Sequence, residues 1–140
     1  SVASNEGIKG NDPKEGAAFG DFDNNGFEDL FVVTGRKEDQ SIFRLYQNRG
    51  NNNHWLTVQL VGNKSNKDAV GAKISLTSEG FTQIRQIVSG SSYLSQNSLW
   101  QTFGLGKTKK IDEIKIVWPS GVVQSLLDVK VDQKIKVLEP

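Results

Sequence analysis

The chain has 140 residues, enough for one domain or two small units, and its 36% hydrophobic and 24% charged residues are typical of a folded globular protein. With 17 basic and 16 acidic residues the net charge is +1, which predicts no nucleic-acid partner. Cysteine is absent, which excludes disulfides and thiol nucleophiles, and no apolar run approaches the roughly 18 residues of a membrane span.

Charge and turn residues divide the chain into two parts. Residues 1–50 hold nine acidic and six basic residues, whereas residues 51–140 hold seven acidic and eleven basic residues. Between them, residues 48–53 form a cluster of Asn and Gly, which favours a turn or junction. We therefore predict one unit over residues 1–50 and a second over residues 51–140. Because the chain begins with Ser1, we expect it to be part of a longer protein.

Three short strands are predicted in the first part, at residues 17–22, 30–34 and 42–47. Such a small set is less than an independent sheet with a buried face usually needs. We therefore expect residues 16–48 to pack against the second part as a strand pair.

The second part has the period-2 alternation of half-buried strands, first at residues 55–60 and then at 70–76, 81–88, 114–118 and 134–138. Glycine-containing turns separate most of these runs at the spacing of a β-sandwich or barrel, and we predict them at residues 62–63, 79–80, 89–90, 104–106 and 119–121. Helix is scarce, because only residues 124–131 could form a short helical turn and their β-branched residues weaken even that preference. The predicted fold class is all-β, with a β-sandwich-like domain that follows an N-terminal strand pair.

A metal-binding loop is the clearest chemical signal, because residues 21–29 place oxygen-bearing side chains at loop positions 1, 3, 5 and 9 with Gly26 at position 6. Calcium takes six to eight oxygen ligands, and glycine at position 6 permits the sharp turn that brings them together. Position 12 is Val32, so the bidentate Glu of an EF-hand is missing. We expect Glu28 to point away from the ion. The predicted Ca²⁺ ligands are Asp21, Asp23, Asn25, the carbonyl of Phe27, and Asp29.

Residues 16–30 with 45–50 resemble one FG-GAP (VCBS-type) repeat, the calcium-bearing blade unit of β-propellers. Residues 51–140 resemble the ASPIC/UnbV domain, through residues 53–56, 65–72, 83–85, 89–96, 103–106 and 118–121. The chain shows a single propeller-blade-like repeat, fewer than a propeller needs. The resemblance implies an extracellular or cell-surface location and a calcium-dependent recognition or architectural role, and it implies no catalytic residues.

The residues themselves also argue against an enzyme. His54 is the only histidine, no Gly-x-Ser-x-Gly motif is present, and no two carboxylates are paired by position. Aromatic and amide side chains in the second part are the types that bind a sugar ring. The predicted ligand-binding residues are Gln83, Arg85, Tyr93, Ser95, Gln96 and Trp100.

Three function classes remain open at this point. We expect a non-catalytic module that binds an extracellular glycan, such as a polysaccharide, or a protein. The alternative is an architectural or protein-adhesion domain of a larger secreted propeller protein, and an enzyme is the third. Two flat, exposed tryptophans would favour glycan binding, a one-sided apolar patch the architectural role, and a deep cleft with perturbed carboxylates the enzyme.

Overall fold

The computed structural model describes residues 14–37 and 40–140, and this part of the chain contains ten β-strands and no helix. The all-β prediction is therefore confirmed. None of the described residues belongs to a helix that could cross a membrane. The strands are β1 (Lys14–Gly20), β2 (Asp29–Lys37), β3 (Gln40–Tyr46), β4 (His54–Val61), β5 (Lys73–Ser78), β6 (Phe81–Gln86), β7 (Gln101–Gly106), β8 (Glu113–Val117), β9 (Val123–Leu126) and β10 (Gln133–Leu138).

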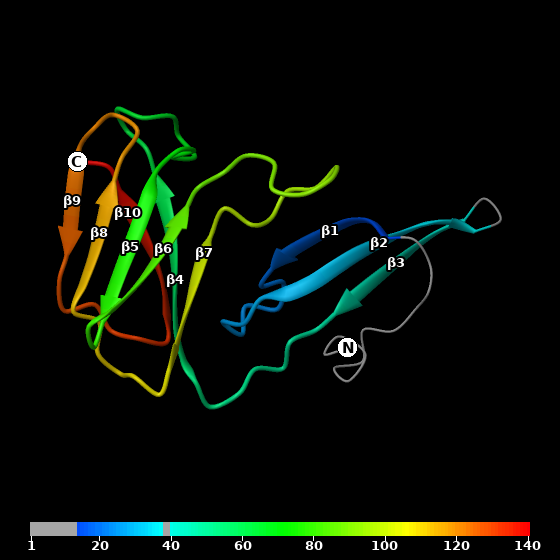
Figure 1. Cartoon of the computed structure of the whole chain (residues 1–140), viewed down its shortest axis with the longest axis horizontal. Helices are drawn as coiled ribbons and strands as arrows, with labels where there is room; N and C mark the ends of the chain where they lie inside the picture. Colours follow the sequence, from blue (N-terminus) through cyan, green and yellow to red (C-terminus); the bar gives the residue numbers. More distant parts are fainter. Residues whose placement is uncertain (1–13, 38–39) are drawn as a thin grey trace.

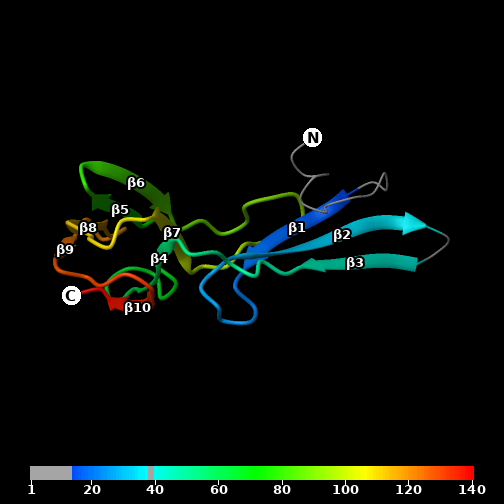
Figure 2. The ribbon, with the colours of Figure 1, turned by 90° about the horizontal axis from the view of Figure 1, so that it is seen from below.

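The strands form three sheets in two lobes (Figure 1). In the first lobe, β1, β2 and β3 form an antiparallel sheet in that order, called here the N-terminal sheet. In the second lobe, the sheet β10-β4-β7 faces the sheet β6-β5-β8-β9, and together they are called the sandwich. Figure 2 shows the two lobes side by side, joined by the segment before β4 and by the loop between β6 and β7.

The hydrophobic core lies between the two sheets of the sandwich. Alternate residues of the central strands point inward and are fully buried, as the period-2 pattern predicts. Trp118, which follows β8, belongs to this core, and its indole N–H donates to Gln124 Oε1 at 3.0 Å. The strand residues of this core with no exposed surface are Leu56 and Val58 of β4, Ile74 and Leu76 of β5, Phe103 of β7, and Ile114 and Ile116 of β8.

Three sequence-based expectations were wrong in detail. The expected strand pair is a three-stranded sheet, because β3 pairs with β2 from Leu30↔Tyr46 to Thr34↔Ile42 and again at Lys37↔Gln40. Residues 101–106 form β7 although Gly104 and Gly106 were interpreted as a turn. These residues form a strand because they pair with β4 from Trp55↔Gly104 to Val58↔Gln101. Residues 123–126 form strand β9 on the edge of the sheet rather than a helix, since pairing with β8 outweighs a weak helical preference.

Candidate metal centre and ligand pocket

The predicted metal loop, residues 21–29, connects β1 to β2 at the end of the N-terminal sheet nearest the sandwich (Figure 1). Its carboxylates organise its own backbone. Asp21 accepts the N–H groups of Asn25 at 3.0 Å and Gly26 at 2.8 Å, and Asp23 accepts the N–H of Asn25 at 3.1 Å. Asn24 and Gly26 have φ angles of 61° and 92°, so the turn uses the left-handed conformation that glycine adopts most readily.

Three carboxylates converge in this loop. One oxygen each of Asp21, Asp23 and Asp29 lies within 4.8 Å of the others. Oxygens on opposite sides of a calcium ion lie about 5 Å apart, because each Ca–O bond is about 2.3–2.6 Å long. The cluster therefore has the size and the hard oxygen donors that calcium requires.

Burial differs among these carboxylates in a way that suits a partly hydrated ion. Asp29 is 2% exposed, and its two oxygens accept the N–H groups of Phe22 at 3.0 Å and Asn48 at 2.7 Å. Asp21 is half-buried, whereas Asp23 is exposed. Water could reach the open side and complete the coordination shell.

The amide of Asn25 is held inside the loop, where Oδ1 accepts the N–H of Phe27 at 2.8 Å and Nδ2 donates to the carbonyl of Asn48 at 2.9 Å. Ligation by Asn25 and by the Phe27 carbonyl stays a prediction. Gln47 also contributes, because its Nε2 donates to Asp23 Oδ2 at 2.6 Å. Sequence reasoning did not assign Gln47 and Asn48 to the site, although both lie in the 45–50 stretch that resembles the FG-GAP repeat.

A lysine from the far end of the chain also reaches the loop. Lys134 of β10 forms an ion pair with Asp21 Oδ2 at 2.9 Å and donates to Asn24 Oδ1 at 2.7 Å. Burial raises the pKa of Asp21, but hydrogen bonds from Lys134 and from the N–H groups of Gly26 and Asn25 outweigh it, so the pKa lies below its ordinary value. Asp21 is therefore ionised at neutral pH, with Lys134 as its counter-charge.

The N-terminal sheet docks on the loop between β6 and β7 through hydrogen bonds that the β1 backbone forms with side chains and backbone of that loop. The N–H of Ala17 donates to Ser95 Oγ at 3.1 Å, and the N–H of Phe19 donates to Asn97 Oδ1 at 3.0 Å. The N–H of Ser98 donates back to the carbonyl of Phe19 at 2.9 Å. β1 is thus held along one edge by a segment of the second lobe.

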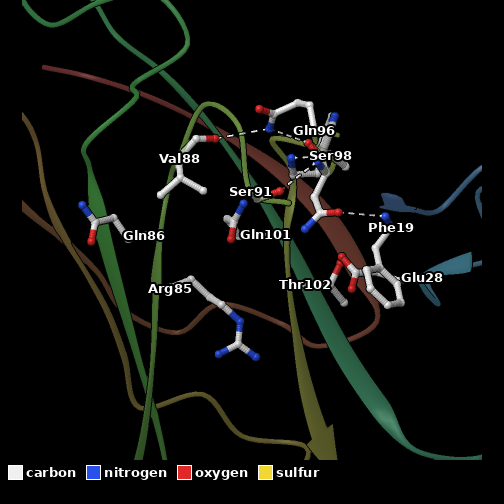
Figure 3. A pocket seen from close by; sticks show the side chains of 12 residues that line it. Phe19, Glu28, Arg85, Gln86, Val88, Ser91, Gln96, Ser98, Gln101 and Thr102 are labelled. Carbon is white, nitrogen blue, oxygen red and sulfur yellow. Dashed lines mark hydrogen bonds between the residues drawn. The ribbon is translucent and has the colours of Figure 1, made fainter. Parts of the chain in front are cut away.

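A polar cavity of about 200 Å³, called here the junction pocket, lies where the two lobes meet (Figure 3). Figure 3 shows Arg85 of β6 and Glu28 of the metal loop reaching it from different sides. The remaining lining comes mainly from residues 86–102. The lining residues are Phe19, Glu28, Arg85, Gln86, Val88, Ser91, Gln96, Asn97, Ser98, Trp100, Gln101 and Thr102.

Strand register explains why polar side chains reach this pocket. Gln83 and Arg85 of β6 pair with Leu76 and Ile74 of β5, so they share the inward face of that sheet at its edge. Arg85 lies 5.2 Å from the centre of the buried Phe103 ring, and Gln83 Nε2 donates to the carbonyl of Gly104 at 2.7 Å. The open edge of the sandwich is therefore lined with polar groups.

The six predicted ligand residues are found in three situations. Arg85, Gln96 and Trp100 line the junction pocket. Gln83 and Ser95 hold backbone groups, as described above. Tyr93 is 73% exposed and lies outside the lining. Gln96 also bonds to Val88, Gly90 and Asn97, so its amide shapes the loop as well as the pocket.

Glu28 lies outside the cluster of Asp21, Asp23 and Asp29 and is half-buried in the junction pocket. Burial raises its pKa above the ordinary value, against the opposing effects of a hydrogen bond with Thr102 and the nearby charge of Arg85. The metal loop consequently lies beside the predicted ligand face, which the sequence offered no reason to expect.

A second buried carboxylate stabilises the far end of the sandwich. Glu139 accepts the N–H groups of Asn63, Lys64 and Ser65 at 2.6–2.7 Å and the hydroxyls of Ser65 and Ser120. Burial would raise the pKa of Glu139, but the hydrogen bonds outweigh it and lower the pKa to about 2. This residue ties the end of β10 to two turns.

The single histidine has a structural partner. Nδ1 of His54 lies 2.7 Å from Asp132 Oδ2, and the other oxygen of Asp132 accepts the N–H of Trp55 at 3.2 Å. The hydrogen bond with His54 is the main cause that holds the pKa of Asp132 below its ordinary value. The pair fastens the start of β4 to the turn before β10.

Comparison with known proteins identifies relatives of this chain. The family model described as ASPIC and UnbV matches residues 62–140. Human cartilage acidic protein 1 is 30% identical over 128 residues, which are 89% of this chain and 19% of that protein. The same protein of Xenopus tropicalis is 33% identical over 109 residues, which are 77% of this chain and 16% of that protein. The chain therefore spans about a fifth of these relatives or less.

Proposed function

Because the chain belongs to the ASPIC and UnbV family, we propose that it is a non-catalytic, calcium-binding recognition module of an extracellular protein, and that it binds a glycan at the junction pocket. The observation that carries the proposal is the position of Glu28, which lies in the metal loop and lines the pocket. Residues 1–50 would be the FG-GAP-like repeat, and the division after residue 50 stays part of this proposal.

Calcium would act structurally. When bound by Asp21, Asp23 and Asp29, with Asn25 and the Phe27 carbonyl as further ligands, it would neutralise three carboxylates and fix the loop that carries Glu28. With at most three carboxylates, we expect a dissociation constant of about 10⁻⁵ to 10⁻³ M, the range of extracellular modules.

Calorimetric titration tests the metal site. We expect one calcium to bind the wild type and binding to be lost in Asp23→Ala, while Asp112→Ala, which removes an acid from a turn of the sandwich, leaves it unchanged. Unchanged affinity in both Asp21→Ala and Asp23→Ala would refute the site.

The junction pocket has the properties that a sugar residue requires. Its volume of about 200 Å³ suits one ring, and its lining combines the Trp100 indole with the amides of Gln96 and Gln101. A pyranose offers C–H groups on its face and hydroxyls on its rim, which match an aromatic ring and hydrogen-bonding amides. Tethering to a longer protein would add avidity to a weak single contact.

The arrangement does not favour hydrolysis of that glycan. Glycosidases use two carboxylates that face each other across the bond, and Glu28 is the single carboxylate in the lining of this pocket. The smaller cavity beside it adds Asp21, but that carboxylate is already ion-paired with Lys134. Glu28 is better suited to accept hydrogen bonds from sugar hydroxyls.

Affinity electrophoresis in soluble β-glucan, xylan, mannan and pectin tests glycan binding, with calcium and with chelator. We expect retardation in at least one polysaccharide, reduced in Trp100→Ala and Arg85→Ala. Tyr93→Ala is the control, because Tyr93 lies on the exposed loop outside the pocket, and this variant should be retarded like the wild type. Free migration of the wild type in every polysaccharide, together with a protein partner recovered by pull-down, would overturn the glycan proposal.

A protein-adhesion or architectural role is the second candidate, and a separate observation favours it. Phe31, Phe43 and Leu45 lie exposed on one face of the N-terminal sheet, and the rings of Phe31 and Phe43 stack with centres 6.0 Å apart. None of the three tryptophans is exposed. Contiguous exposed apolar surface is typical of a protein contact. Phe43→Ser should weaken such a contact and leave polysaccharide binding unchanged.

A further inference from the structure

Lys134 occupies an unusual position, because a base on the last strand contacts the acidic loop between the first two strands. Residues 21–29 contain the carboxylates of Asp21, Asp23, Glu28 and Asp29 and no basic residue. The Lys134 ammonium contacts Asp21 Oδ2 at 2.9 Å and Asn24 Oδ1 at 2.7 Å. The acidic loop is therefore partly neutralised from outside, across 110 residues of sequence.

The surroundings of Lys134 hold its side chain in this position. The β10-β4-β7 register places Lys134 beside Thr57, and Thr57 beside Thr102, in one row across the outer face of the sheet. The hydroxyls of Thr57 and Thr102 lie 3.1 Å apart, and Thr57 is buried. The ammonium also lies 5.9 Å from the centre of the Trp100 ring, at a distance suited to a cation–π contact.

The loop also packs on the sandwich at a second point. The Trp55 indole lies so close to Gly26 that a Cβ built there would be 2.1 Å from ring atoms. Lys134 and Trp55 therefore hold the loop at Asp21 and at Gly26. Trp55 contacts Gly26 by close packing, whereas Lys134 contacts Asp21 through an ion pair.

We propose that the Lys134 ammonium is a resident counter-cation for the metal loop, which keeps the N-terminal sheet docked on the sandwich without calcium. Calcium bound in the same loop would then make Lys134 dispensable for docking, since it also neutralises the carboxylates. The second half of this inference rests on the calcium site proposed above. Lys134 is a positioning residue, because it acts on the loop through Asp21 and Asn24.

Two backbone amides report docking directly. The N–H groups of Ala17 and Phe19 donate across the junction to Ser95 and Asn97, so their hydrogen exchange measures how often the N-terminal sheet leaves the sandwich. A structural change confined to the Lys134 side chain would not affect them. NMR exchange on the full chain, in calcium and in chelator, gives both protection factors.

We expect the wild type to protect both amides in both conditions. Lys134→Met keeps the aliphatic stem but removes the charge, and its protection in chelator should fall about tenfold or more, as expected for the loss of a charge-assisted hydrogen bond. Saturating calcium should restore it. Lys134→Arg keeps the charge and should behave like the wild type, as should Lys136→Met, the matched control on the same face of β10.

Two results would overturn the proposal. Lys134→Met could remain protected in chelator, or it could stay unprotected although calorimetry shows that calcium is bound. If calorimetry shows no calcium binding to the wild type, the calcium site fails together with the restoring effect. In that case, loss of protection in Lys134→Met would still support the role of Lys134 in docking without calcium.

Discussion

Substitution of Gly26 by alanine tests how the metal loop fits the sandwich. Gly26 has a φ of +92°, and a Cβ at this position would lie 2.1 Å from Cε2 and Cζ2 of Trp55. Two costs therefore combine. A left-handed alanine costs roughly 1–2 kcal/mol, and forcing a methyl group into packed surroundings costs typically about 1–3 kcal/mol.

Gly80 provides the matched control. Its φ is +80°, but a Cβ there would meet nothing within 4 Å, so Gly80→Ala carries the backbone cost alone. We expect Gly26→Ala to lower the free energy of unfolding by about 1–3 kcal/mol more than Gly80→Ala does. This difference is the part due to the Trp55 contact.

Urea unfolding followed by tryptophan fluorescence measures both variants, and exchange of the Phe19 amide shows whether the cost appears as undocking. Trp55→Ala should abolish the excess cost of Gly26→Ala in a double-mutant cycle, because the obstructing ring is then gone. If Gly26→Ala and Gly80→Ala agree within about 0.5 kcal/mol in both measurements, the packing argument is refuted.

Three further outcomes are expected. Glu139 has a pKa of about 2 in the folded chain against an ordinary 4.5, so its stabilising effect is present above about pH 4.5 and is lost as the pH falls toward 2. Between about pH 4.5 and 2 the free energy of unfolding should therefore fall more steeply in the wild type than in Glu139→Gln. Equal pH dependence in the two proteins would contradict the assignment. Ile116→Ala should cost about 2–5 kcal/mol in urea unfolding, because Ile116 is fully buried opposite Ile74, whereas the exposed Val123→Ala should cost far less. Calcium at about 100 times its dissociation constant should stabilise the wild type by about 2.7 kcal/mol, and an equal gain in Asp23→Ala would show that the ion binds elsewhere.

Most strands could be predicted from the sequence, because alternating residues show directly which side faces the core. The start of β4 and the fully buried Ile74 and Ile116 follow this rule. Strand β7 was missed because Gly104 and Gly106 resemble turn residues, and only the pairing of residues 101–106 with β4 shows that they form a strand. A pairing partner is a property of the fold and is not visible in the local sequence.

The candidate site was predictable only where its residues are adjacent in the chain. Asp21, Asp23 and Asp29 lie in one turn, so their spacing alone indicated that they converge. Glu28 falls at loop position 8, outside this spacing, and its direction depends on the lobe packed beside the loop. Lys134 had no signal in its own neighbourhood, since its function depends on the register of β10 against β4.

The parallel pairing of β4 with β10 has a consequence for the order of folding during synthesis. β4 is the centre of its sheet, and its register with β10 joins Leu56 to Gln133 and Val61 to Leu138. Loop closure over such a separation is entropically costly, and proteins rich in distant contacts fold slowly. During synthesis on the ribosome, more than half of the chain is made after β4 and before β10 is complete. Until β10 leaves the exit tunnel, one edge of β4 is unpaired and open to other strands. We therefore expect nascent chains that stop before residue 133 to bind chaperones and to aggregate.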